Sequence, residues 1–333
     1  MKRVNRFVVL IVIIFLMILV FYWVRQSALE RQENSAAPVQ NKIVLGFSQL
    51  GAESAWRSAN SESIKSAAKE AGIELKFSNA FQKQEEQIKA LRSFIAQQVD
   101  VIAFSPIVET GWDAVLNEAK ISGIPVVILD RGIDIQDPSL YVTYIGSDFE
   151  EEGRRAGRWL LEQVKGVNRN IEVVEIQGNS GSAPAIGRKK GFEEIVKKNT
   201  YIKIIDSQYG DFIKSKGKEV MEAFLKAEGP KIDYLFAHND DMALGAIEAI
   251  EEYGLKPGKD IKIISVDAGK AAFEAMLAGK INCAVECNPL QGPVLMDTVK
   301  NILDGKQVPK RILIEEGIFP EETAAEEFPN RKY

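Results

Sequence analysis

The chain has 333 residues, with 42 lysines and arginines against 47 aspartates and glutamates. This length exceeds one typical domain and suits two, with ample capacity to bury two cores. The mildly acidic charge excludes the global positive field that attracts nucleic acid, so nucleic acid is not an expected partner.

An apolar run near the N-terminus, Phe7–Val24, contains no charged residue. Its length is close to the ~20 residues with which a helix crosses a hydrocarbon core of roughly 30 Å. Basic residues precede the run, so the positive-inside rule predicts a cytoplasmic N-terminus and an extracytoplasmic remainder. We predict a transmembrane signal anchor over residues 1–25. The alternative is a cleaved signal peptide, which has a shorter apolar region followed closely by small residues.

Residues 26–41 are polar and lack periodicity, which predicts a flexible tether. Short apolar strands then alternate with amphipathic helices, and this alternation requires a mostly parallel sheet with helices on both faces. The strands of this first half are expected at Lys42–Phe47, Ile73–Phe77, Val99–Phe104 and Pro125–Asp130.

The same alternation resumes in the second half, which indicates an internal duplication and therefore two similar α/β lobes. Its strands are expected at Ile171–Ile176, Ile202–Asp206, Ile232–Ala237 and Ile261–Val266. The elements that follow residue 267 are more than a second lobe needs, so the chain is expected to cross back to the first.

Polar and aromatic side chains gather where these strands end, and ligands of open α/β sheets bind just beyond the carboxyl ends of the strands. Sugars need both kinds of group, because their C–H faces stack on aromatic rings while carboxylates, guanidinium groups and amides hold their hydroxyls. Singly, each residue could equally be a helix cap or a surface ion pair. Together they predict a sugar-binding cleft formed by Trp56, Arg57, Asp130, Arg131, Arg188, Asp211, Phe212, Asn239 and Asp267.

Catalytic and metal chemistry have little support in the sequence. His238 is the one histidine of the chain, and no nucleophile in a recognisable motif accompanies it. The glycine-rich stretch Gln177–Gly187 fits no phosphate-binding motif and is expected to turn backbone amides towards a polar ligand. Cys283 and Cys287 are expected to be core residues rather than a disulfide, a lipid attachment site or zinc ligands. No cofactor is expected.

Several long motifs resemble the bacterial sugar-binding proteins of ABC transporters, in the ribose-binding and LacI-like group, and within it the galactofuranose-binding proteins most closely. The similarity runs from about Lys42 to Glu327. The motifs that carry it are GFSQLGAESAWRSA, QKQEEQIKALRSFIAQQVD, PVVILDR, RKKGF, GDFIKSKGKEVMEAF, AHNDDMALGAIEAI and GLKPGKDI.

This resemblance implies the type I periplasmic binding protein fold, in which two doubly wound parallel-sheet lobes are joined by a three-crossover hinge and close on one sugar. Lobe 1 is then expected over residues 42–146 plus 288–314, and lobe 2 over residues 147–287 plus 315–330. The resemblance assigns ligand positions to the strand-tip residues named above and adds Glu53 beside the ligand and Glu286 at the hinge.

The resemblance also implies a monosaccharide ligand and an ABC permease as partner. The expected N-terminal anchor departs from the usual soluble or lipid-tethered forms of the family. A membrane-anchored receptor that presents its sugar-bound state to a sensor kinase is therefore the alternative. A glycosidase is a weaker alternative, because it needs carboxylates paired across a bond.

Overall fold

The computed structural model describes residues 6–35 and 42–333. The chain divides into two compact units, Met1–Lys42 and Ile43–Tyr333, which are described separately below.

The first unit contains one long helix, α1 (Arg6–Ser35). Within it Val8–Ala28 has a mean hydropathy of 2.8 and is exposed, so this stretch is long and apolar enough to cross a membrane. The helix continues to Ser35 and thereby corrects the prediction of a flexible tether for residues 26–35. That segment is rich in alanine, leucine, glutamate, arginine and glutamine, which propagate a helix well. Residues 36–41 of the predicted tether lie outside the described residues.

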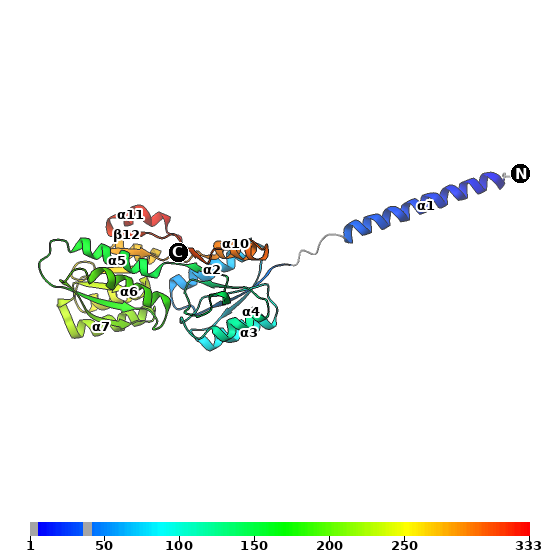
Figure 1. Ribbon diagram of the computed structural model, residues 1–333. Helices are drawn as coiled ribbons and strands as arrows, with labels where there is room; N and C mark the ends of the chain where they lie inside the picture. The colour runs from blue at the N-terminus through cyan, green and yellow to red at the C-terminus, as the bar shows by residue number, and fades with distance from the viewer. Residues whose placement is uncertain (1–5, 36–41) are drawn as a thin grey trace. The chain divides into compact units, whose positions relative to one another are not determined.

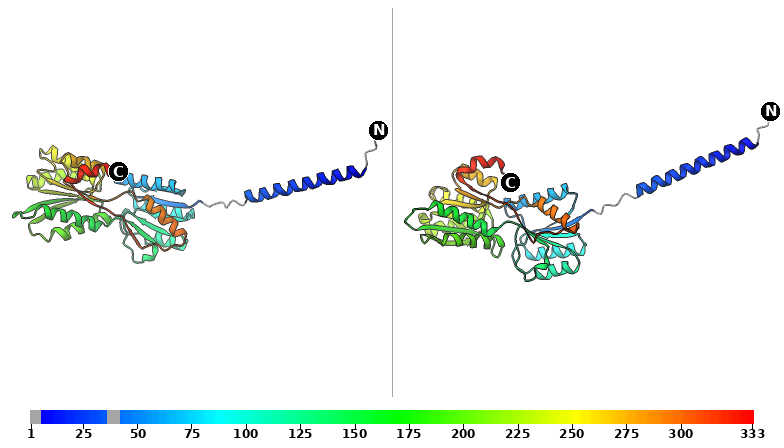
Figure 2. Two further views of the ribbon diagram at one scale, coloured as in Figure 1. Left: turned by 90° about the horizontal axis from the view of Figure 1, so that it is seen from above. Right: turned by 45° about the horizontal axis from the view of Figure 1, so that its top comes forward.

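The second unit has two lobes, which lie side by side in all three views (Figures 1 and 2). Lobe 1 contains the elements β1 (Val44–Gln49), α2 (Ala55–Glu70), β2 (Glu74–Asn79), α3 (Gln84–Ala96), β3 (Val101–Phe104), α4 (Asp113–Ile121), β4 (Val126–Leu129), η1 (Pro138–Leu140), β5 (Thr143–Gly146), α10 (Gly292–Leu303) and β11 (Arg311–Leu313). Its six strands form one parallel sheet in the order β11-β5-β4-β3-β1-β2.

Lobe 2 contains α5 (Phe149–Gln163), β6 (Ile171–Gln177), α6 (Ala183–Val196), β7 (Ile202–Tyr209), α7 (Lys214–Glu228), η2 (Gly229–Lys231), β8 (Tyr234–Ala237), α8 (Asp240–Glu252), β9 (Lys262–Asp267), α9 (Lys270–Leu277), β10 (Cys283–Glu286), β12 (Ile318–Pro320), η3 (Glu321–Thr323), α11 (Ala324–Glu327) and η4 (Phe328–Asn330). Its sheet has the order β12-β10-β9-β8-β6-β7, and β12 runs antiparallel to β10.

The first five strands of each lobe share one order, β2-β1-β3-β4-β5 in lobe 1 and β7-β6-β8-β9-β10 in lobe 2. Each sheet is covered on both faces. In lobe 1, α2 and α10 cover one face and α3 and α4 the other. In lobe 2, α5 and α6 cover one face and α7, α8 and α9 the other. The predicted two-lobed, doubly wound fold is therefore confirmed.

Three segments cross between the lobes: the one from β5 to α5, the one from β10 to α10, and the one from β11 to β12. Glu316, in the third segment, joins all three. Its Oε1 accepts hydrogen bonds from Ser147 Oγ at 2.5 Å and from the backbone N–H of Asn288 at 2.9 Å. The crossovers form a compact hinge at one side of the cleft, and the ends of β1, β4, β6, β8 and β9 form the rims of the cleft.

Candidate functional site

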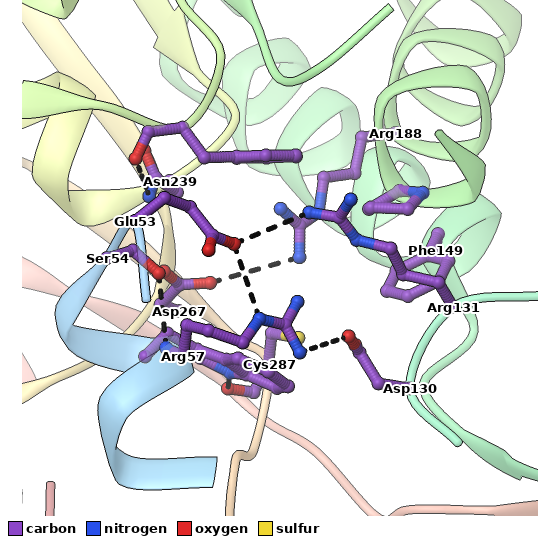
Figure 3. A pocket seen from close by; sticks show the side chains of 13 residues that line it. Glu53, Ser54, Arg57, Asp130, Arg131, Phe149, Arg188, Asn239, Asp267 and Cys287 are labelled. Carbon is purple, nitrogen blue, oxygen red and sulfur yellow. Dashed lines mark hydrogen bonds and ion pairs between the residues drawn. The ribbon is translucent and has the colours of Figure 1, made fainter. Parts of the chain in front are cut away.

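A small cavity lies between the two lobes and has a volume of about 30 Å³. Both lobes and one crossover line it (Figure 3). Lobe 1 contributes Glu53, Ser54, Trp56, Arg57, Asp130 and Arg131; lobe 2 contributes Phe149, Pro184, Arg188, Phe212, Asn239 and Asp267; and the second crossover contributes Cys287. Three arginines, three acidic residues and three aromatic rings therefore converge on one enclosed space.

Strand ends and helix starts hold these side chains in place. Ser54 caps α2 by accepting a hydrogen bond from the backbone N–H of Arg57 at 3.1 Å, and Asn239 caps α8 in the same way through Met242 N at 3.0 Å. Asp130 follows β4 with a φ of 63°, and Asp267 ends β9 with a φ of 116°. Such positive φ angles cost free energy in non-glycine residues, so the surrounding fold must compensate for them.

The aromatic groups form the walls of the cavity. Trp56 is nearly buried, and its Nε1 donates a hydrogen bond to the carbonyl oxygen of Cys287 at 2.6 Å, which fixes the plane of the indole ring. Phe212 packs on Gly178, where an added Cβ would lie 1.8 Å from the ring, so glycine is required there. The Arg131 guanidinium lies 5.1 Å from the centre of the Phe212 ring, within the range of cation–π attraction.

Two arginines of lobe 1 share the carboxylates of that lobe. Arg57 Nη1 lies 2.7 Å from Asp130 Oδ2, and Arg57 Nε lies 3.3 Å from Glu53 Oε1. Burial alone would lower the pKa of Arg57, but the charges of Asp130 and Glu53 outweigh it and raise that pKa. Arg131 is 3.8 Å from Glu53, and burial together with the charge of Arg57 lowers its pKa to about 10. Both guanidinium groups are therefore charged at neutral pH.

Arg188 of α6 is the central cation of lobe 2. Its Nε lies 2.7 Å from Glu152 Oε2, its Nη2 lies 3.9 Å from Asp267 Oδ1, and its Nη1 donates a hydrogen bond to the carbonyl oxygen of His238. Burial opposes the charge, but the attraction of Glu152 and the other nearby acids raises the pKa of Arg188. The close packing of α5 against α6 permits this contact, because a Cβ on Gly153 would lie 2.1 Å from the Arg188 carbonyl oxygen.

Asp267 lies next to a second buried acid, Asp240. Asp240 accepts hydrogen bonds from Ser265 Oγ and, at 2.8 Å, from the backbone N–H of Gly269. Burial raises the pKa of Asp240 to about 7, and burial together with the charge of Asp240 raises the pKa of Asp267 well above its ordinary value. The two neighbouring carboxyl groups therefore disfavour each other's ionisation.

Asp130 Oδ2 has no hydrogen-bond partner among the described residues, but it forms an ion pair with Arg57 Nη1 at 2.7 Å. Two further buried polar atoms of the lining have neither a hydrogen-bond partner nor an ion-pair partner there: Glu53 Oε2 and Arg131 Nε. The side chains to which they belong are 2% and 3% exposed. A buried polar group without a partner costs about 1–3 kcal/mol, and more when it is charged. One acceptor and one donor are therefore available to a polar ligand inside the cavity.

The structure brings together Glu53, Trp56, Arg57, Asp130, Arg131, Arg188, Phe212, Asn239 and Asp267. Two other expected ligand residues, Asp211 and Glu286, do not line the cavity in this structure. Asp211 lies outside the lining, because the turn after β7 directs Phe212 inward in its place. Glu286 also lies outside, since its carboxylate binds Arg331 Nη1 and the backbone N–H of Gly317, each at 2.9 Å.

Sequence reasoning missed four lining residues, Ser54, Phe149, Pro184 and Cys287. Ser54 could have been found as the cap of the helix that carries Trp56. Phe149 and Cys287 lie at crossovers, and no local pattern marks them as ligand-facing. Cys283 and Cys287 are both buried free thiols.

His238 does not line the cavity. Its ring is fully buried, with Nε2 3.0 Å from Glu175 Oε1, and only its backbone carbonyl reaches the site, through Arg188. A possible metal-ligand group, formed by Glu152, Cys287 and Glu316, has ligand atoms within 4.8 Å of one another. Burial raises the pKa of all three groups, and the two carboxylates already have protein partners, because Glu152 pairs with Arg188 and Glu316 accepts a hydrogen bond from Ser147.

The fold and the enclosed polar cavity define a two-lobed binding protein that closes on a small ligand. Comparison with known proteins agrees, because residues 45–307 match the family described as "Periplasmic binding protein domain". The chain belongs to the periplasmic binding protein family, and the resemblance inferred from the sequence motifs is confirmed.

Three relatives are particularly similar. The galactofuranose-binding protein YtfQ of Escherichia coli (strain K12) is 49% identical over 293 residues, which cover 87% of this chain and 92% of that protein. A Mycobacterium smegmatis protein in complex with β-D-fucofuranose is 55% identical, with a TM-score of 0.86 over 87% of this chain and 95% of that one. The binding protein of the arabinose ABC transporter from Shewanella sp. ANA-3, bound to α- and β-L-arabinofuranose, is 49% identical, with a TM-score of 0.84 over the same shares.

Proposed function

We propose that this chain captures one monosaccharide in its furanose ring form between the two lobes. The observation that carries this proposal is the enclosed interlobe cavity, in which aromatic walls surround an unpartnered acceptor, Glu53 Oε2, and an unpartnered donor, Arg131 Nε. A sugar ring offers C–H faces to the aromatic rings and hydroxyl groups, each of them donor and acceptor, to both atoms. The relatives bound to furanose sugars at 49–55% identity support the choice of ring form.

The proposed ligand contacts come from both rims of the cleft. Trp56 and Phe212 would enclose the ring, while the guanidinium groups and carboxyl groups hold the hydroxyls. Asn239 would add its amide. The proposed ligand residues are thus Glu53, Trp56, Arg57, Asp130, Arg131, Arg188, Phe212, Asn239 and Asp267.

Ligand entry requires motion at the hinge. A cavity of about 30 Å³ compares with the roughly 10–15 Å³ of probe-occupied volume that one water molecule needs, so a sugar cannot enter while the lobes are in this position. The lobes must separate, admit the sugar and close on it. Contacts from both rims then favour the closed form.

The proposed partner is an ABC permease, to which the closed, sugar-bound lobes would be presented. The binding lobes are extracytoplasmic, as expected of this family. We propose further that α1 is retained as a membrane anchor, because Val8–Ala28 can span a membrane. The intact mass of the mature protein, and its recovery in the membrane pellet after a carbonate wash, distinguish an anchor from a cleaved signal peptide.

A sensory role is the second candidate, and the observation that favours it is α1. A helix that connects the binding lobes to a membrane could place them beside a sensor kinase. Uptake of radiolabelled sugar by cells that lack the gene separates the two roles. Loss of uptake supports transport, whereas normal uptake with an absent transcriptional response to the sugar supports the receptor.

We propose no catalytic activity, because the acids of the cavity are engaged with arginines and His238 is buried behind Arg188. Incubation of the protein with the bound sugar and with its methyl glycosides, followed by chromatography, tests this. Any released product would support a glycosidase.

The test of sugar capture is a thermal-shift series with L-arabinose, D-galactose and D-fucose, each of which interconverts between ring forms in water. A ligand bound only by the folded state at 100 times its Kd stabilises the protein by about 2.7 kcal/mol. Methyl furanosides and methyl pyranosides of the same sugars serve as locked-ring controls. We expect stabilisation by the free sugars and none by the methyl pyranosides. Stabilisation by pyranosides alone, or by none of these compounds, contradicts the proposal.

A further inference from the structure

The loop between β6 and α6, which belongs to lobe 2, contacts lobe 1. Its residues up to Ser182 are not part of the cavity lining. Asn179 Oδ1 accepts a hydrogen bond from Arg131 Nη2 at 3.2 Å, and Asn179 Nδ2 donates to Gln82 Oε1 at 3.4 Å. In the same loop, the carbonyl oxygen of Gly181 accepts from the backbone N–H of Glu109 at 3.1 Å. Three contacts of one lobe 2 loop thus reach three separate segments of lobe 1.

The loop that presents Asn179 is held within lobe 2. Ser182 donates two hydrogen bonds to the Asn179 carbonyl oxygen, from its backbone N–H at 3.2 Å and from its Oγ at 2.7 Å. The Asn179 side-chain amide also donates to the carbonyl oxygen of Asp211 at 3.3 Å. Gly181, with a φ of 74°, supplies the left-handed turn. The Asn179 side chain is therefore oriented before it meets lobe 1.

Arg131 has one terminal nitrogen fixed by each lobe. Its Nη1 donates to the carbonyl oxygen of Ile107 in lobe 1 at 3.3 Å, and its Nη2 donates to Asn179 in lobe 2. These two bonds set the plane of the guanidinium group and leave Nε without a partner among the described residues. An arginine can only donate hydrogen bonds, so the Asn179 oxygen must be the atom that faces it.

We propose that Asn179 is a positioning residue, which orients Arg131 for the ligand only when the two lobes are together and so couples closure of the cleft to sugar binding. This inference rests on the proposed function and deepens it. In a separated pair of lobes Arg131 keeps its lobe 1 contacts with Ile107 and Glu53 but loses the bond to Asn179, and its long side chain regains rotamer freedom. The bond between Asn179 and Arg131 therefore stabilises the closed form. The same bond orients Arg131 as a hydrogen-bond donor to the sugar.

The sequence predicts a different use for this loop, since the glycine-rich stretch Gln177–Gly187 is expected to turn backbone amides towards a polar ligand. Its contacts with lobe 1 are made instead by the side chain of Asn179 and by the carbonyl oxygen of Gly181.

Three variants of the full-length chain, purified in detergent, test the proposal with L-arabinose, D-galactose and D-fucose as probes. Asn179→Ala removes both side-chain contacts. Asn179→Asp retains the oxygen that accepts from Arg131 and loses the amide donor. Ser180→Ala is the matched control, because Ser180 is exposed and its side chain makes no hydrogen bond within the described part of the chain. Affinity comes from calorimetry, and rates come from stopped-flow tryptophan fluorescence.

We expect Asn179→Ala to raise the dissociation rate by about 10-fold or more, the scale of one lost charge-assisted hydrogen bond, with little change in the association rate. Asn179→Asp should restore most of the affinity, and Ser180→Ala should behave like the natural protein. Equal rates for Asn179→Ala and Ser180→Ala overturn the proposal. An equal loss in Asn179→Asp and Asn179→Ala also overturns it, because the contact with Arg131 would then be irrelevant.

A second measurement needs no sugar. Spin labels on Ile121→Cys in lobe 1 and Lys226→Cys in lobe 2, both exposed positions, report the distance between the lobes, while the buried Cys283 and Cys287 stay unlabelled. In sugar-free protein, Asn179→Ala should shift the distance distribution towards longer distances. If Asn179→Ala and the natural protein give identical distance distributions, the proposal that Asn179 stabilises the closed form is overturned. This readout stands even if none of the three sugars binds, an outcome that would reject the proposed function instead.

Discussion

Arg57 Nη1 lies 2.7 Å from Asp130 Oδ2, and both side chains are 4% exposed. The pair joins the start of α2 to the end of β4. The positive charge of Arg57 is therefore balanced by a negative charge on the same lobe. Removal of one partner of such a buried pair leaves an uncompensated charge, which is costly because the remaining group is shielded from water.

We predict that Arg57→Gln lowers the unfolding free energy of the sugar-free protein by about 3–5 kcal/mol, since Asp130 and Glu53 would lose their shared cation. Chemical denaturation measures this. The matched control is Arg92→Gln, because Arg92 lies 2.8 Å from Glu118 in an exposed pair, and its loss should cost less than about 1 kcal/mol. Equal small losses in both variants contradict the prediction.

Trp56 contributes a ring surface and a hydrogen bond, which two variants separate. Trp56→Ala should weaken sugar binding by about 2 kcal/mol or more, the scale of an anchor residue removed from a desolvated pocket. Trp56→Phe keeps a ring but loses the bond from Nε1 to the Cys287 carbonyl oxygen, and should cost about 1 kcal/mol. Calorimetric titration with the sugar measures both. If Trp56→Ala and Trp56→Phe lose the same amount of binding free energy, a stacking role for the ring is rejected.

The hinge carboxyl group of Glu316 predicts a pH dependence of stability. Burial, followed by the charge of Glu152, raises the pKa of Glu316 to about 9 from an ordinary value of 4.5. The folded state therefore holds a proton that the unfolded state releases, so this contribution is fully present below about pH 4.5 and is lost as the pH rises through about 9.

Glu316→Gln mimics the protonated carboxyl group and keeps the oxygen that accepts from Ser147 and Asn288. We expect this variant to be more stable than the natural protein at pH 9, by about 1 kcal/mol or more, with a smaller difference at pH 5. Melting temperatures across this range measure the effect. The control is Glu315→Gln at the exposed neighbouring position. A constant difference from pH 5 to pH 9 would exclude ionisation of Glu316 as the cause.

Removal of residues 1–42 should leave sugar affinity and the melting temperature unchanged, because Ile43–Tyr333 forms a compact unit with its own cores. The shortened protein should also leave the membrane fraction. Calorimetry and cell fractionation check the two parts. If affinity falls, the N-terminal unit contributes to binding; if the shortened protein stays in the membrane pellet, α1 is not its anchor.

Much of the fold followed from local pattern. Apolar runs such as Ile232–Ala237 predicted buried parallel strands, and Asn239 predicted the cap of α8, because strand and helix periodicity depend on neighbouring residues. The polar strand tips predicted the place of the site, since the carboxyl ends of parallel strands meet at one edge of each sheet.

Local pattern was ambiguous at other places in the chain. Residues 26–35 are polar, yet they extend α1, because a formed helix propagates through good helix-forming residues. Asp211 and Phe212 are adjacent, and either could have faced the ligand. Both have positive φ angles, 56° and 61°, and this turn directs the ring of Phe212 into the cavity. The carbonyl oxygen of Asp211 accepts a hydrogen bond from Asn179.

The sequence by itself determined the two-lobed α/β architecture, the apolar N-terminal helix and most of the residue types that face the cleft, because these depend on periodicity, caps and strand ends. Only the tertiary structure decided which groups pair. Trp56 meets Cys287, Arg188 meets Glu152, and Arg131 meets Asn179, each across a long stretch of chain. Hydrogen bonds and ion pairs act over a few ångströms in space, whatever the separation in sequence, so the free donor and acceptor of the cavity emerge only once both lobes are folded and brought together.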